Sequence, residues 1–250
     1  MSRPLVLLHG WGLTPAVWQP LLDALPKTLD VHTPALPGHA QATAAAPGIA
    51  AWTEALLAQI PHDAVVCGWS LGAMVALDLA ARHPSHVARL ILIGSTPRFV
   101  STTSRDHGDA WPHGLDPAVA DDFAARFDHD PAATMQRFVA LQALGDARRR
   151  AVTTALTAAL SDTGAEGARA LADGLQVLTT TDLRPAIARI TRPTLLLHGD
   201  GDALMPLAAA QWLAAHLPRA RLLPLAGCGH APFLSQAADC AAAIGRFTLE

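Results

Sequence analysis

The chain has 250 residues, of which 51% are hydrophobic, which is enough for one large domain or for a core with an insertion. Its formal net charge of −3 argues against a nucleic-acid-binding protein, and the absence of tyrosine excludes catalysis by a tyrosine side chain. Three cysteines without paired spacing, and no recognisable signal or membrane-spanning segment, predict a cytoplasmic protein without disulfides or structural zinc.

Short apolar runs alternate with helical patterns in the first part of the chain. We predict strands at 5–8, 31–36, 64–67 and 88–93, and helices at 16–25, 49–60 and from 73 onward. Alternating strands and helices indicate right-handed crossovers and a mostly parallel, twisted sheet. Uninterrupted apolar strands are typical of a sheet that helices cover on both faces.

From Pro97 the pattern changes, because no strand is predicted between Arg98 and Arg189. Helical segments are expected there near 117–127, 131–144, 147–160 and 165–178. Strands return at 193–198 and 221–225, with helices at 206–217 and from 236. We therefore predict an α/β core (1–96 and 190–250) and an all-helical cap (97–189) over the carboxyl ends of the strands, where open α/β sheets bind ligands. The alternative is a helical packing layer without a substrate role.

The most informative motif is Gly68-Trp69-Ser70-Leu71-Gly72, which joins a predicted strand to a predicted helix. A sharp strand–turn–helix connection is the context of the G-x-S-x-G nucleophile elbow. The glycines would let strand and helix approach closely, so that Ser70 is held out at the edge of the sheet. The motif alone is weak evidence, because a serine hydroxyl also needs a base and an orienting carboxylate.

Chain position singles out one base among the 12 histidines. His230 follows the last predicted strand and precedes the last helix. This is where the base should lie if the catalytic residues occur along the chain in the order serine, acid, histidine. Asp200 and Asp202 both follow the strand at 193–198, and their spacing does not separate them as candidates for the acid; either could instead cap the next helix. His198 and His216 are expected to be structural or surface residues.

Two backbone N–H groups are candidates for an oxyanion hole. One belongs to Leu71, directly after the serine, and the other to Trp11 in the loop His9-Gly10-Trp11-Gly12 after the first strand. Gly10 would let the backbone turn so that the N–H of Trp11 faces the pocket. A metal at His9 is unattractive because no partner has suitable local spacing, and we predict no metal or other cofactor.

With these features in order, the chain resembles the α/β-hydrolases over nearly its whole length. More narrowly, it is similar to the methyl ester esterases of biotin biosynthesis that act on pimeloyl-[acyl-carrier protein]. The likeness rests on segments 8–13, 68–72, 137–142, 181–184 and 230–233. Three features are discriminating together: tryptophan before the serine, Phe-x-Ala-Leu-Gln in the cap, and Asp-Leu-Arg after it.

The resemblance implies a serine carboxylesterase that releases methanol from the methyl ester of carrier-bound pimeloyl. By position, Ser70 is the nucleophile, His230 the base and Asp202 the acid in place of Asp200, since Gly199, Asp202 and Pro206 match the family's G-x-x-D-x-x-x-P. The implied oxyanion donors are Trp11 and Leu71, and the implied substrate-binding residues are Trp11, Ser70, Leu71, Phe138, Val139, Ala140, Leu141, Gln142 and His230. Edge strands that usually precede the first strand are expected to be missing.

Acyl-carrier proteins are acidic, so a docking surface for one should present arginines. Arg148, Arg149 and Arg150, with Arg137 nearby, could form such a surface, or the run could be only a solvated helix face. We also expect the protein to act on small esters, to bind neither nucleic acid nor a membrane, and to be a monomer. The alternatives are a general short-chain carboxylesterase, a carbon–carbon bond hydrolase or lyase on the same fold and, more remotely, a non-catalytic receptor.

Overall fold

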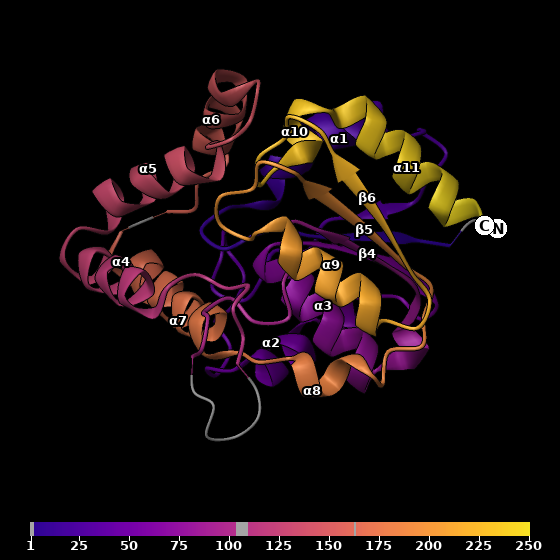
Figure 1. Ribbon diagram of the computed structural model, residues 1–250, viewed down its shortest axis with the longest axis horizontal. Helices are drawn as coiled ribbons and strands as arrows, with labels where there is room; N and C mark the ends of the chain where they lie inside the picture. The colour runs from indigo at the N-terminus through magenta and orange to yellow at the C-terminus, as the bar shows by residue number, and fades with distance from the viewer. Residues whose placement is uncertain (1–2, 104–109, 163) are drawn as a thin grey trace.

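The computed structural model describes residues 3–103, 110–162 and 164–250. Within these residues the centre of the molecule is a six-stranded sheet in the order β2-β1-β3-β4-β5-β6 (Figure 1). The strands are β1 (Leu5–Leu8), β2 (Val31–His32), β3 (Ala64–Trp69), β4 (Val87–Ile93), β5 (Thr194–Gly199) and β6 (Ala220–Leu225). Every neighbouring pair is parallel, so the predicted α/β class is confirmed and all strands end at one edge.

Helices cover both faces of the sheet, and successive strand residues belong to two different hydrophobic clusters. In β1, Val6 and Leu8 pack in one cluster, while Leu5 and Leu7 pack in the other. The strand residues that face either side of the sheet are therefore apolar, as the sequence pattern predicts. The first cluster includes α2 (Ile49–Leu56), α3 (Leu71–Arg82) and α9 (Leu207–His216), and the second includes α1 (Gln19–Ala24) and α11 (Ala237–Leu249).

The prediction of a strand over 31–36 is wrong for most of its length, because β2 ends at His32. Pro34 has no N–H to donate to a neighbouring strand, and the chain leaves the sheet before it. The predicted helix at 16–25 begins as a 3₁₀ turn and becomes α1, with Pro20 in the first turn of α1. This 3₁₀ turn is η1 (Pro15–Trp18), and further short elements include η2 (Leu57–Gln59), η3 (Pro84–His86) and α10 (Pro232–Ser235).

Between β4 and β5 lies a helical insertion made of α4 (Pro117–His129), α5 (Pro131–Gln142), α6 (Arg149–Ala158) and α7 (Ala165–Thr180). The helices α4 and α5 each begin with an Asp-Pro pair, in which the aspartate side chain accepts a backbone N–H and proline occupies the first turn. Figure 1 shows the insertion as a separate lobe beside the sheet. Its assignment as a cap of residues 97–189 over a core of 1–96 and 190–250 stays a prediction.

The two ends of the insertion are tied to each other by Asp182. Its carboxylate accepts from Arg98 at 2.7 Å and from Arg184 at 2.7 Å, and the N–H of Leu183 donates to the carbonyl of Pro97 at 2.9 Å. Burial raises the pKa of Asp182, but hydrogen bonds from Arg184 and Arg98 hold it below its ordinary value. The short helix α8 (Arg184–Ile187) begins at the last residue of the Asp-Leu-Arg segment and packs against α3; the sequence pattern does not predict it.

No helix in the described part of the chain combines the length and the apolar character needed to cross a bilayer.

Candidate active site

Ser70 lies in the turn between β3 and α3, with a φ of +57° and a ψ of −120°. This left-handed conformation is strained for any residue other than glycine. Glycine is required on both sides of it. A Cβ on Gly68 would overlap the carbonyl of Gly72, and a Cβ on Gly72 would overlap the carbonyl of Leu8 in β1. The turn therefore has the tight strand–turn–helix geometry that the G-x-S-x-G motif requires.

His230 and Asp202 form a buried pair. Nδ1 of His230 lies 2.7 Å from Oδ2 of Asp202, while Oδ1 of Asp202 accepts the N–H groups of Leu204 and Met205, each at 2.9 Å. Burial raises the pKa of Asp202, but His230, His198 and the N–H of Met205 hold it below its ordinary value. An ionised carboxylate at this position keeps the proton of the imidazole on Nδ1.

The other ring nitrogen of His230 is available for proton transfer. Nε2 is buried and has no hydrogen-bond partner among the described residues. Because Nδ1 carries the proton, Nε2 of the neutral ring is an acceptor. His198 lies near this pair, with Nε2 3.5 Å from Oδ2 of Asp202 and 2.7 Å from the carbonyl of Met205. His198 thus packs against the loop that contains Asp202, as expected of a structural residue. Asp200 is exposed and accepts the N–H of Gly227 at 2.8 Å.

The end of β4 brings Ser70 and His230 together. The N–H of Ser70 donates to the carbonyl of Ile93 at 3.1 Å, and the next residue, Gly94, has a φ of +49°. A Cβ on Gly94 would lie 3.0 Å from Nδ1 of His230, so glycine is needed for the ring to sit there. Gly10 approaches from the other side, where a Cβ would lie 3.3 Å from Cβ of Ser70.

Trp69 packs beneath the turn, a position that the sequence leaves open. The side chain is fully buried, and its ring lies 5.0 Å from that of Phe233 and 6.4 Å from that of Trp18. Its indole N–H donates to the backbone carbonyl of His230 at 2.8 Å. The tryptophan before the serine thus connects the nucleophile turn to the loop that carries the histidine.

The loop after β1 is held by two buried histidines. Nδ1 of His9 lies 2.8 Å from the carbonyl of Gly10, and Nε2 accepts the N–H of Leu36 at 3.0 Å. Nε2 of His39 accepts the N–H of Gly12 at 3.0 Å, and the two rings meet edge to face at 5.3 Å. These bonds fix the backbone on both sides of Trp11. Leu71, the other predicted donor, is the first residue of α3, where helical N–H groups have no partner within the helix.

These two histidines predict an acid-sensitive fold. Burial lowers the pKa of His9 from 6.5 to about 3 and that of His39 to about 4. Between these values and 6.5 the unfolded chain binds more protons than the folded one, so the free energy of unfolding falls as the pH is lowered below 6.5. The slope is up to about 1.4 kcal/mol per pH unit for each histidine.

Urea denaturation at pH 7.5, 6.0 and 5.0 measures this slope. The variant His39→Gln retains an acceptor for the N–H of Gly12 but does not titrate, so its slope should be shallower than that of the wild type. A wild-type free energy of unfolding that is constant over this range would contradict the expectation.

An apolar pocket of about 110 Å³ lies between the insertion and the loop after β1. Its lining is Trp11, Phe99, Leu115, Val119, Ala120, Phe123, Phe138, Leu141, Leu175, Leu178, Thr179, Ala203 and Leu204. The indole of Trp11 donates to the carbonyl of Leu171 at 2.8 Å, and its ring meets that of Phe138 edge to face at 5.1 Å. The pocket is thus adjacent to the Gly10–Trp11 backbone beside Ser70.

Only part of the predicted 138–142 segment lines this pocket. Phe138 and Leu141 do, whereas Val139 packs in the opposite cluster with Val152 and Leu156. Ala140 is partly exposed, and the buried Gln142 accepts the N–H of His230 through its backbone carbonyl at 3.2 Å. Successive residues of a helix point about 100° apart, so five in a row cannot face one cavity.

Comparisons with known proteins identify the family of this chain. The profile of the alpha/beta hydrolase fold family matches residues 3–237. The chain is 57% identical over 245 residues, which are 98% of each chain, to the pimeloyl-[acyl-carrier protein] methyl ester esterase of Aromatoleum aromaticum. It is 37% identical to the protein of the same name from Nitrosomonas europaea, over 92% of this chain and 90% of the relative. The chain belongs to the α/β-hydrolases, in the family of pimeloyl-[acyl-carrier protein] methyl ester esterases.

Solved structures of more distant α/β-hydrolases share the fold. An esterase from Exiguobacterium antarcticum matches with a TM-score of 0.81 and 20% identity, over 100% of this chain and 94% of that one. A bromoperoxidase from Bacillus anthracis matches with a TM-score of 0.84 and 22% identity, over 100% and 93% of the two chains. At these identities the likeness concerns the fold alone.

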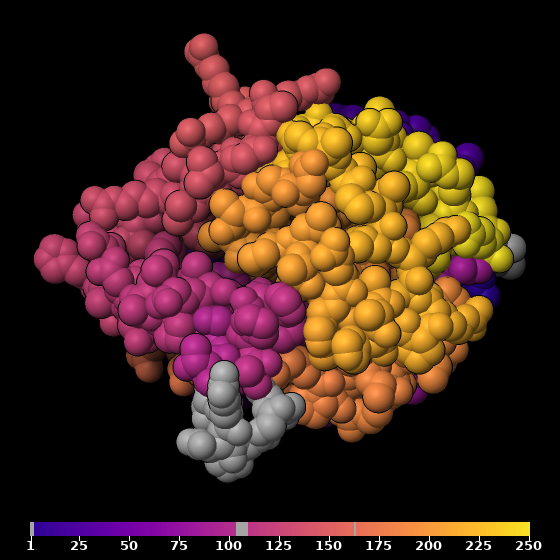
Figure 2. Space-filling view, in the orientation of Figure 1, coloured from indigo at the N-terminus to yellow at the C-terminus, as the bar shows by residue number. Residues whose placement is uncertain are grey.

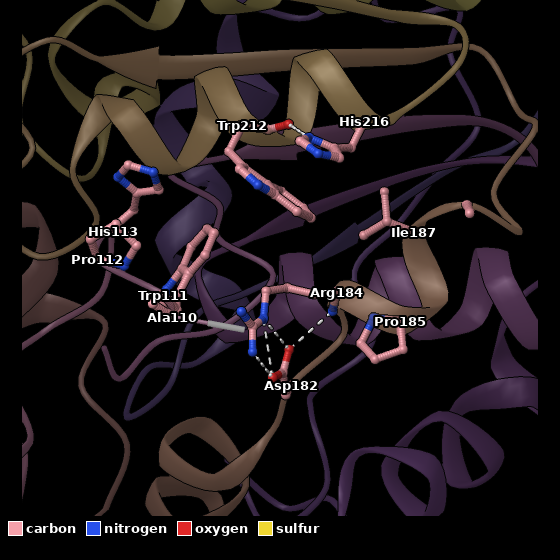
Figure 3. Close-up of a pocket in the computed structure, with 11 residues that line it drawn as sticks. Ala110, Trp111, Pro112, His113, Asp182, Arg184, Pro185, Ile187, Trp212 and His216 are labelled. Carbon is pink, nitrogen blue, oxygen red and sulfur yellow. Dashed lines mark hydrogen bonds and ion pairs between the residues drawn. The ribbon is translucent and has the colours of Figure 1, made fainter. Parts of the chain in front are cut away.

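This α/β-hydrolase has a second, larger pocket of about 560 Å³, shown in Figure 3. Trp111 and Trp212 lie in its wall, and Asp182 and Arg184 pair with each other beside Trp111. Neither pocket's lining includes Ser70, Asp202 or His230, but the smaller pocket contains Trp11, from the loop beside Ser70, and Ala203, the residue after Asp202. Asp182 and Arg184 in the wall of the larger pocket belong to the tie that joins the two ends of the insertion, so the smaller apolar pocket is the candidate acyl site of this family member.

The predicted docking arginines occupy different surroundings. Nη1 of Arg148 donates to the carbonyl of Ser235 in α10 at 2.7 Å, so this side chain ties the insertion to the core. Arg149 and Arg150 are exposed on α6, whose side chains project from the surface in Figure 2. Arg137 is exposed on α5, in a shallow groove with Arg126.

Among the described residues, no group of three or more histidine, cysteine, aspartate or glutamate side chains could hold a metal ion. Cys67, Cys228 and Cys240 are free thiols, and all three are buried.

Proposed function

We propose that the chain is a serine carboxylesterase of biotin biosynthesis that hydrolyses the methyl ester of pimeloyl-[acyl-carrier protein] to methanol and the free carboxylate. The observation that carries the proposal is the 2.7 Å pair of His230 and Asp202 beside the strained turn of Ser70. The 57% identity to a relative of that name supports the substrate.

In the first step, Oγ of Ser70 attacks the ester carbonyl while its proton passes to Nε2 of His230. The N–H groups of Trp11 and Leu71 stabilise the oxyanion, and Asp202 stabilises the imidazolium that forms. His230 then returns the proton to the departing methoxide, which leaves as methanol. The result is an acyl ester on Ser70.

In the second step, His230 takes a proton from a water molecule, and the resulting hydroxide attacks the acyl ester. Collapse of the tetrahedral intermediate returns a proton to Oγ of Ser70 and releases the carboxylic acid, which ionises in water. Both steps use the same three side chains and the same oxyanion donors.

The acyl chain occupies the apolar pocket between Trp11, Phe138 and Leu141. Each methylene that leaves water contributes about 0.8 kcal/mol to binding. Uncharged walls suit the polymethylene part of the acyl group. The acyl end attached to the carrier leaves this pocket toward the exposed arginines of the insertion.

An acidic carrier protein docks on Arg137, Arg149 and Arg150, which are exposed on α5 and α6. Arg148 contributes less to docking because its guanidinium is engaged with Ser235. Exposed charges of this kind act chiefly through the encounter of the two proteins, and added salt screens them.

Hydrolysis assays with the purified protein test the substrate. We expect faster turnover of a carrier-bound methyl ester than of esters of longer alcohols or of diketones.

The triple variant Arg137→Ala/Arg149→Ala/Arg150→Ala should raise KM for the carrier-bound ester about tenfold, because it removes three charges that each contribute less than about 1 kcal/mol to binding. KM for a free methyl ester should not change.

The matched control is Arg219→Ala, because Arg219 is also exposed and lies directly before β6.

Complementation of a biotin auxotroph that lacks this esterase tests the role in the cell. Failure to hydrolyse methyl esters, with preference for longer alcohols or diketones, would instead indicate another enzyme of this fold. No reaction of Ser70 with a fluorophosphonate probe would indicate a non-catalytic receptor.

A further inference from the structure

The loop that carries His230 is held from two sides. On the core side, the indole N–H of Trp69 donates to the carbonyl of His230 at 2.8 Å. On the insertion side, the N–H of His230 donates to the carbonyl of Gln142, the last residue of α5, at 3.2 Å. The histidine backbone is therefore fixed both by the nucleophile turn and by the end of a helix of the insertion.

A buried carboxylate next to α5 holds the same loop through its neighbours. Oδ2 of Asp146 accepts the N–H of Gly229 at 3.0 Å and the hydroxyl of Ser235 at 2.8 Å. Its Oδ1 accepts the N–H of Arg148 at 2.7 Å. Gly229 directly precedes His230, and Ser235 is the last residue of α10, directly after the loop. One side chain thus bonds to the chain on both flanks of the histidine.

The turn that contains Asp146 also contacts the loop of the acid. A Cβ on Gly145, which has a φ of +82°, would overlap the carbonyl of Gly201, the residue before Asp202. The N–H of Ala147 donates to the carbonyl of Gly227 at 2.8 Å. The segment 142–147 therefore lies against both loops whose side chains form the His230–Asp202 pair.

We propose that Asp146 is a positioning residue that fixes His230 for proton transfer and couples the insertion to the catalytic pair. This inference rests on the proposed role of His230 as the base. A carboxylate suits the position because its two oxygens accept three donors, and hydrogen bonds to a charged acceptor are stronger than neutral ones. Without it, the buried N–H of Gly229 loses its partner and the loop shifts.

The test compares Asp146→Ala and Asp146→Asn with Asp200→Ala. Asp200 is a matched control, since its exposed carboxylate also accepts an N–H of this loop, that of Gly227, at 2.8 Å. We expect Asp146→Ala to lower kcat on a small methyl ester between about 10- and 100-fold with little change in KM, as a displaced catalytic group does. Asp146→Asn, which retains one acceptor oxygen, should lie between it and the wild type.

Two further measurements separate positioning from general loss of structure. All rates are taken well below the thermal midpoint of each variant, and the downfield proton resonance of the Nδ1–H of His230 is recorded. This signal should broaden or vanish in Asp146→Ala and persist in Asp200→Ala. If Asp146→Ala does not fold, the isosteric Asp146→Asn decides.

Equal kcat values for Asp146→Asn and the wild type, or equal losses in Asp146→Ala and Asp200→Ala, would overturn the proposal. The variant His230→Ala keeps this outcome distinct from failure of the proposed function. If His230→Ala is as active as the wild type, the assigned base is wrong. If it is inactive while both Asp146 variants are fully active, only the positioning role is wrong.

Discussion

Ser70→Ala should lower kcat on methyl esters by on the order of 10⁵-fold or more, the loss typical of removing a serine nucleophile whose base and oxyanion donors remain. The substitution removes only the hydroxyl. Alanine and serine tolerate the φ of +57° about equally, so the turn and the fold should persist.

The measurement is the steady-state rate on a methyl ester, together with labelling by a fluorophosphonate. Circular dichroism and the thermal midpoint serve as the control for folding. The labelling of the wild type should be complete and that of Ser70→Ala absent. Retention of more than a few per cent of wild-type turnover by a folded Ser70→Ala protein would contradict the assignment of the nucleophile.

Asp202→Asn should lower kcat by about 10⁴-fold, the loss found when the carboxylate of a serine triad becomes an amide. The amide oxygen can still accept the N–H groups of Leu204 and Met205, which Oδ1 of the carboxylate accepts at 2.9 Å each. The NH₂ group then faces Nδ1 of His230 and turns that nitrogen into the acceptor. The proton moves to Nε2, which can no longer act as the base.

The comparison with Asp200→Asn makes this test specific, because both carboxylates follow β5. Asp200 is exposed and bonds only to a backbone N–H in the described part of the chain, so its variant should keep kcat within about twofold of the wild type, as is usual for surface substitutions. A larger loss in Asp200→Asn than in Asp202→Asn would exchange their roles.

The fold is largely predictable because its signals are local. The apolar run of β1 and the strand–turn–helix pattern around Ser70 each lie within about ten residues of sequence, as hydrophobic periodicity and turn glycines do. Elements without such signals were missed or misjudged. The four-residue helix α8 is too short to show a helical period, and β2 ends early at Pro34.

The site is less predictable where it depends on contacts between distant segments. Spacing alone does not separate Asp200 from Asp202. What distinguishes them is that Asp202 bonds to His230, which lies 28 residues after it in the chain. Trp69 bonds to a carbonyl 161 residues away, and Asp146 bonds to an N–H 83 residues away. No local sequence pattern predicts such contacts, and neither His39 nor Asp146 lies in a recognisable motif.

The uncharged walls of the pocket between Trp11, Phe138 and Leu141 have a consequence for what happens after hydrolysis. The substrate enters as a neutral ester, but the product has an ionised carboxylate at the reacting end. A carboxylate moved from water to a site with apolar neighbours loses several kcal/mol of hydration. On the proposed binding mode, in which the acyl chain lies along these walls and its reacting end lies beside Ser70, we expect the charged product to bind less tightly than the neutral ester. The charge created by the reaction would then favour product release and a low level of product inhibition.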